Sequence, residues 1–209
     1  VGVRGVVNRV QGTTFADIEP RASLKVALGD NFSVKAGYAR IHQYVQQVST
    51  NYIDLPTDLW QPVSARFKPL QSDLYSIGVY GNLPWNMYFS VEGWYKDMDN
   101  LLEYREGVSV LNPDLAWEDK LTSGKGWSYG VDLSVTREVG KITGTVGYGL
   151  LWNWRKFDDL NQGVKFPAKF DNRHKININA SYKLNEKIEF NAGWTFTTGN
   201  RMTLSTYNY

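Results

Sequence analysis

The chain has 209 residues and a formal net charge of only +2 at pH 7, which gives no extended basic surface and argues against a nucleic-acid partner. It contains no cysteine, which excludes disulfide scaffolds, thiolate chemistry and cysteine zinc sites. Its longest uncharged apolar run is far shorter than the roughly 18 residues that a membrane-spanning helix needs. Aromatic residues reach 14%, and Tyr and Trp favour positions with one wet and one apolar end.

Apolar and polar residues alternate along most of the chain, and this period of two predicts β-strands with one apolar and one polar face. In residues 18–28, for example, Leu24 and Val26 lie on one face and Ser23 and Lys25 on the other. We expect about nine strands of roughly 10 residues, a length that spans a bilayer when the strand is tilted. They are predicted at residues 1–7, 18–28, 32–38, 75–79, 89–96, 128–136, 142–153, 175–184 and 188–197.

The connections between these strands are expected to alternate between short and long. Short ones are predicted at residues 29–31, 82–87, 138–141 and 184–187, and long ones at 8–17, 42–70, 97–126 and 156–171. Bacterial outer-membrane barrels have short periplasmic turns and long external loops, because only the outer side has to meet the ligand. The pattern therefore predicts an all-β fold, an antiparallel transmembrane β-barrel, and it assigns a direction to every strand.

A soluble β-sandwich alternates in the same way and is the main alternative. The strand lengths, the rhythm of the loops and the aromatic residues at the strand ends favour the membrane barrel. Trp127, Tyr129, Trp152 and Trp154 are expected near the outer end, with Tyr182 and Phe190 near the inner turns, as interface girdles require. An odd number of antiparallel strands cannot close a barrel, so residues 1–209 are expected to form a partial barrel domain, incomplete at both ends.

Several segments resemble the TonB-dependent receptors of the Bacteroidetes type, in the region before the final barrel strands. They are residues 19–24, 55–60, 92–104, 124–130, 166–174 and 198–200, in matching order. The resemblance implies a 22-stranded barrel in the outer membrane of a Gram-negative bacterium, with an N-terminal plug domain that is absent from this chain. It also implies the partners: the TonB complex acting through the plug, the lipid bilayer, an external ligand and a surface lipoprotein lid.

The expected function is therefore to form the wall and external loops of a transporter that imports a nutrient by active transport. A passive porin, an outer-membrane enzyme barrel and a soluble binding module are the alternatives. Residues 126–130 fit the nucleophile-elbow pattern of hydrolases, but the strand continues and no helix follows. Residues 145–149 spell a potassium-channel filter without the helices that such a filter needs. We expect no enzyme activity, no catalytic residue, no cofactor and no metal site.

Large aromatic residues in the predicted outer loops are the candidates for ligand contact. Tyr52 and Trp60 lie in the longest loop, beside Leu59, and Trp117 lies in the next. Such residues stack on a ligand or pack loop against loop, and packing is the more frequent role in long loops. The charged residues of the polar face are mixed in sign and are expected to pair with the plug or with neighbouring strands. They are Arg21, Lys25, Lys35, Glu92, Lys96, Asp132, Lys175, Lys183 and Glu189.

Overall fold

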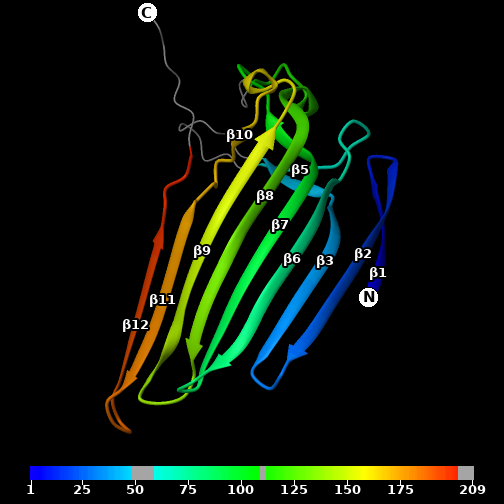
Figure 1. Ribbon diagram of the computed structural model, residues 1–209. Helices are drawn as coiled ribbons and strands as arrows, with labels where there is room; N and C mark the ends of the chain where they lie inside the picture. The colour runs from blue at the N-terminus through cyan, green and yellow to red at the C-terminus, as the bar shows by residue number, and fades with distance from the viewer. Residues whose placement is uncertain (49–58, 109–111, 202–209) are drawn as a thin grey trace, which may run out of the picture.

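The computed structural model describes residues 1–48, 59–108 and 112–201. Within these residues nine strands form one antiparallel meander, in which each strand pairs with the next along the chain (Figure 1). They are β1 (Gly2–Val10), β2 (Thr13–Leu28), β3 (Phe32–Gln43), β6 (Leu70–Leu83), β7 (Met87–Tyr104), β8 (Leu121–Arg137), β9 (Ile142–Lys156), β11 (His174–Lys183) and β12 (Glu189–Thr197). The predicted all-β antiparallel fold of about nine strands is confirmed.

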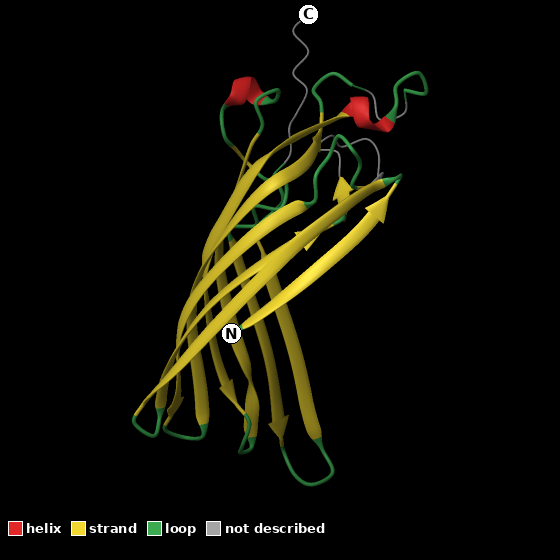
Figure 2. Ribbon diagram, turned by 90° about the vertical axis from the view of Figure 1, so that its right-hand side faces the viewer, coloured by secondary structure: helices red, strands yellow, loops and turns green. Residues whose placement is uncertain are grey.

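Short turns lie at one end of the sheet and longer connections at the other, except that the two-residue turn between β1 and β2 lies at the end of the longer connections (Figure 2). We call these the turn end and the loop end. The connections at the loop end contain a hairpin of β4 (Val45–Val48) and β5 (Leu59–Pro62), the 3-10 turns η1 (Trp117–Lys120) and η2 (Asn161–Gly163), and β10 (Phe166–Pro167), which pairs with β9. No helix among the described residues is long and apolar enough to cross a membrane.

The prediction of a long connection at residues 8–17 is wrong. β1 and β2 form a continuous hairpin from Gly2 opposite Arg21 to Val10 opposite Thr13. Its turn consists of Gln11 and Gly12, both with positive φ, 50° and 83°. Two consecutive residues of positive φ turn the chain with the twist of the flanking strands, which closes a hairpin in two residues. Gln-Gly is a weaker signal than Asn-Gly, and the polar residues around it suggested a loop.

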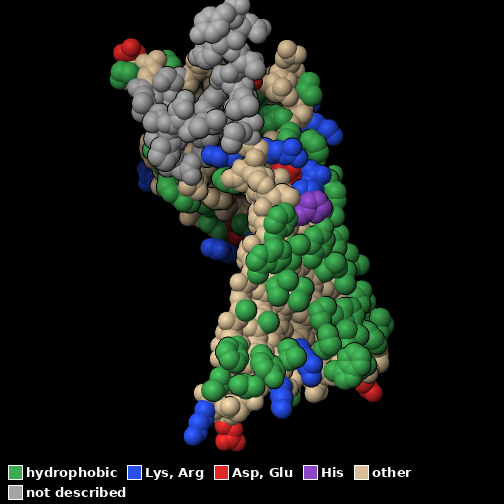
Figure 3. All heavy atoms as spheres, turned by 90° about the vertical axis from the view of Figure 1, so that its left-hand side faces the viewer, with side chains coloured by type: hydrophobic (Ala, Val, Ile, Leu, Met, Phe, Trp, Pro, Cys, Tyr) green, Lys and Arg blue, Asp and Glu red, His purple; other side chains and the backbone are tan. Residues whose placement is uncertain are grey.

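The apolar residues of successive strands lie side by side, since the register carries one face across the whole sheet. Leu24 pairs with Ala36, Ala36 with Ile77, and Val146 with Ile178. This apolar face is open: Leu24 is 64% exposed and Ile77 61%. Seen from the side of β12, hydrophobic side chains gather along one side of the wall, and charged ones lie towards both ends (Figure 3). A wall of this kind needs an apolar medium around it.

An aromatic row borders the apolar face towards the loop end. Tyr38, Tyr75, Tyr95, Tyr129 and Trp152 are register partners across five consecutive main strands. The ring centroids are 5.1 Å apart in the first pair and 5.3 Å apart in the last. Towards the turn end, the rings of Phe32 and Phe89 meet with centroids 6.1 Å apart. Aromatic residues at both borders are typical of the two interfaces of a membrane barrel.

Gly130 is required by close contact between strands, which gives a first prediction. A Cβ atom there would lie 2.4 Å from the carbonyl oxygen of Leu150 and 3.0 Å from the ring of Trp94, whereas one at Gly93 would meet nothing closer than 4.0 Å. We expect Gly130→Ala to lower the free energy of unfolding by about 1–3 kcal/mol through overpacking. Gly93→Ala, the matched control one strand away, should change it by less than about 0.5 kcal/mol. Urea unfolding of the full-length protein in lipid vesicles measures both, and equal midpoints would contradict the assignment.

Candidate functional site

The loop end holds the buried core of the chain, and a β-bulge in β7 shapes it. The register between β7 and β8 shifts between Asp99 and Leu101, and the intervening Asn100 has a φ of 63°. Gln46 of β4 fills the gap in the ladder: its side chain donates to the carbonyl of Asn100 (2.9 Å) and accepts from the amide of Leu102 (3.2 Å). Gln46 is itself buried, 6% exposed. The β4–β5 hairpin is therefore held on β7 by hydrogen bonds that a bulge would otherwise leave unmade.

A first apolar cluster packs under this hairpin. It consists of Val48, Phe67, Leu102, Tyr104 and Leu121, with Trp117 against it. The rings of Trp117 and Phe67 have centroids 6.0 Å apart. The structure thus places Trp117 in contact between two loop segments, which is the packing role weighed for it.

Trp60 lies on the same hairpin but in a different environment. It pairs with Gln47 in the β4–β5 register and is 63% exposed. Leu59 and Val45, its apolar neighbours on the hairpin, are 42% and 44% exposed. Tyr52 lies outside the described residues. Trp60 is therefore an exposed aromatic side chain on a hairpin that is fixed at its base, an arrangement suited to stacking on a ligand.

A second cluster joins β7 to the segment between β9 and η2. Leu101, Phe157 and Leu160 form its buried part. Beside it, Arg155 pairs with the buried Glu103 at 2.5 Å. Burial raises the pKa of the Glu103 carboxyl, and the charge of Arg155 opposes that rise. A buried carboxylate has to be paired in this way, because removing one partner leaves an uncompensated charge.

Side chains also tie β2 to β3 where their ladder stops. The ladder ends at the pair of Arg21 and Ala39. Beyond it, Glu19 accepts from the backbone amide of His42 (2.8 Å), and Tyr44 donates its hydroxyl to Asp17 (2.8 Å). Burial, followed by the bond to Asp17, raises the pKa of Tyr44 to about 12. No short-range spacing indicated this contact, since its members are more than 20 residues apart in the chain.

The polar face carries a charged row across the middle of the sheet. The register aligns Lys25, Lys35, Gly78, Glu92, Asp132, Gly149 and Lys175 on consecutive main strands. Tyr80 lies over Gly78, donates its hydroxyl to Glu92 and receives the ammonium of Lys35 over its ring. The row is mixed in sign, as the sequence predicted, and part of it already has partners on the wall.

Trp94 is a functional candidate that sequence reasoning missed. It lies on the polar face, covers Gly130 and donates its indole N–H to Asp132 at 2.8 Å. Trp94 alternates with Glu92 and Lys96 in the sequence, which places it on the predicted polar face. The predicted aromatic girdle lies on the apolar face and does not include it.

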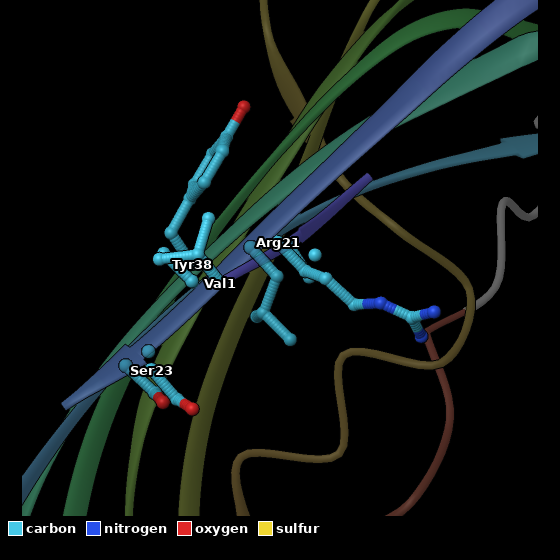
Figure 4. Close-up of a pocket in the computed structure, with 10 residues that line it drawn as sticks. Val1, Arg21, Ser23 and Tyr38 are labelled. Carbon is cyan, nitrogen blue, oxygen red and sulfur yellow. The ribbon is translucent and has the colours of Figure 1, made fainter. Parts of the chain in front are cut away.

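A concavity of about 560 Å³ lies at the β1–β3 side of the sheet. Figure 4 shows Arg21 and Tyr38, both in its lining, diverging from each other, and the register places them on different faces of the sheet because Tyr38 pairs with Ala22, the neighbour of Arg21. Its walls therefore come from both faces of the sheet, and we assign it no ligand.

The two motifs that resemble a nucleophile elbow and a channel filter, residues 126–130 and 145–149, lie within regular β-strands. Ser128 is an interior residue of β8, so it does not stand on a strand-to-helix turn. Residues 145–149 lie within β9, where Val146 is on the apolar face and 50% exposed. Within the described ranges, no group of three or more His, Asp or Glu side chains is arranged to hold a metal ion.

Comparisons with known proteins agree with this architecture. Among solved structures, the alcaligin outer-membrane receptor FauA of Bordetella pertussis is similar with a TM-score of 0.58 and 16% identity, over 94% of this chain and 33% of that one. FpvA of P. aeruginosa bound to heterologous pyoverdines gives 0.60 and 17%, over 88% and 24%. FpvAI in complex with pyocin S2 gives 0.58 and 18%, over 87% and 23%. At these identities the likeness shows the fold alone.

The chain spans a third or less of the length of these structures. No curated protein matches it by sequence. A family model described as "TonB dependent receptor-like, beta-barrel" matches residues 1–209. Since that match covers the sequence from end to end, the chain belongs to the TonB-dependent receptor β-barrel family.

Proposed function

We propose that the chain forms part of the wall and the outer vestibule of a transporter in the outer membrane of a Gram-negative bacterium. The transporter imports a nutrient ligand by active transport, with energy from the TonB complex. The observation that carries the proposal is the open apolar face between two aromatic borders, on a chain that matches the receptor family over residues 1–209. In a membrane barrel the apolar face contacts lipid, and the polar face lines a lumen that holds either a transport path or a plug domain.

The charged row of the polar face fits the plug domain that the family resemblance implies. Lys25, Asp132 and Lys175 present both signs at mid-height, where a polar domain inside the barrel finds matching charges. In this proposal residues 1–209 are a partial domain of a 22-stranded barrel. The TonB complex acts on the plug. The receptor is of the Bacteroidetes type and has a surface lipoprotein lid.

The ligand meets the loop end first. Trp60 is the exposed contact of the β4–β5 hairpin, Tyr52 belongs to the same connection, and Trp117 supports the neighbouring loop from within. Two of the similar structures are named for alcaligin and for pyoverdines. Chelates of that kind are one candidate class of nutrient, and an aromatic side chain at a fixed hairpin suits their recognition by stacking.

A plugged transporter and a passive porin differ in what they do to liposomes. We expect liposomes containing the purified full-length protein to keep their volume in an isosmotic sugar solution, because a plug closes the lumen. A general porin, as the positive control, lets the sugar in and the liposomes swell. Swelling at the porin's rate would overturn active transport in favour of passive diffusion.

Trp60→Ala should weaken ligand binding by about tenfold, because it removes one stacking contact that contributes roughly 1 kcal/mol or slightly more. Binding is measured by calorimetry on the full-length protein, with the nutrient whose uptake is lost when the gene is deleted. Val164→Ala, another exposed apolar loop residue at 58% exposure, is the matched control and should bind normally. Equal affinities for the two variants would remove Trp60 from the ligand site.

A further inference from the structure

Basic side chains gather beyond the aromatic row on one sector of the wall. Lys125 of β8 and Lys156 of β9 are register partners, and they lie two residues beyond the paired Trp127 and Trp154. The register here is unbroken, so both lysines extend from the apolar face. Side chains of both are exposed. They therefore lie just beyond the aromatic border, at the level of the lipid headgroups.

Two further cations lie over the tryptophan rings of the same sector. The ammonium of Lys165 is 5.0 Å from the ring centroid of Trp154. The guanidinium of Arg173 is 4.9 Å from that of Trp152. Cation–π contacts of this geometry hold the charges against the wall. Figure 3 shows basic side chains gathered above the hydrophobic wall, below the loops.

The neighbouring sector has the opposite sign at the same height. Asp73 of β6 and Asp97 of β7 are register partners, and Asp99 follows two residues on. Arg40, the cation of that sector, is already bound to Asp73 at 2.8 Å and 3.0 Å. Charge is thus separated along the circumference, acidic over β6 and β7 and basic over β8 to β10.

The carboxylates nearby neutralise only part of the basic sector. Asp99 pairs with Lys125 at 3.1 Å, and Asp171 pairs with Arg173 at 2.8 Å. Lys156 and Lys165 form no ion pair with any carboxylate in the described part of the chain. Lys125 and Lys156 also stand directly opposite each other, an arrangement that is unfavourable without an anion between them.

We propose that this sector binds the phosphate groups of a phosphorylated lipid in the outer leaflet. Lys125, Lys156 and Lys165 contact the phosphates, and the acyl chains lie along the apolar face of β8 and β9. Over β6 and β7, Asp97 forms no ion pair within the described residues and repels the same headgroups, which favours the basic side of the wall for the lipid. The proposal rests on the proposed function only in placing the apolar face in the membrane, and it is independent of any ligand or of TonB.

The test compares two probes, bisphosphorylated lipid A and its dephosphorylated form, in phosphatidylcholine nanodiscs that contain the full-length protein. Native mass spectrometry counts the lipid that stays bound. The variant Lys156→Gln/Lys165→Gln removes two charges from the basic sector. Lys141→Gln/Lys187→Gln removes two exposed charges at the turn end and is the matched control.

We expect the wild type and the control to retain the phosphorylated probe in preference to the other. The sector variant should lose about 25-fold in retention, since each lysine near an anionic lipid surface contributes about fivefold. The loss should shrink at high salt, because exposed charges are screened. Equal retention of the two probes by the wild type, or equal losses in the two variants, would overturn the proposal. If instead the protein entered no nanodisc and stayed soluble without detergent, the membrane function itself would fail.

Discussion

The backbone hydrogen-bond ladder is the interaction on which the rest of the structure depends. Within the described strands it runs from β1 to β12 through consecutive antiparallel pairs, with a single shift of register along the β7–β8 pair. In an apolar medium each unmade backbone bond costs several kcal/mol, so the ladder has to be satisfied within the sheet. An unbroken register also brings like residues together across strands. The aromatic row, the charged row and the basic sector all follow from it.

Where the ladder stops, buried polar side chains take its place. Gln46 bridges the bulge at Asn100, and Glu19 holds the amide of His42. The apolar cluster around Leu102 lies beside the first of these contacts. The wall and the loop end are thus built differently: the wall relies on the surrounding medium to cover its apolar face, while the loop end buries a core of its own.

The strands and their faces were predictable from the sequence because alternation is local. The pattern of Leu24 and Val26 against Ser23 and Lys25 needs no partner to be recognised. What failed or was missed depends either on a backbone conformation that residue type does not fix or on contacts distant in sequence. The turn at Gln11 and Gly12 depends on backbone conformation that many residue pairs can adopt, and β7 reaches Tyr104 because the loop core continues it. Trp60 and Trp117 read alike in sequence, and only the packing partner Phe67 separates them.

The bulge in β7 reverses the alternation of that strand. Before it, odd-numbered residues such as Tyr95 lie on the apolar face; after it, Leu101 contacts the position of Gly126 on the opposite face. The one extra residue of the bulge therefore switches the face to which odd-numbered side chains point. An insertion or deletion beyond the bulge can invert the loop end without disturbing the wall below. The side chains presented at the loop end can then change while the apolar face of the wall stays the same.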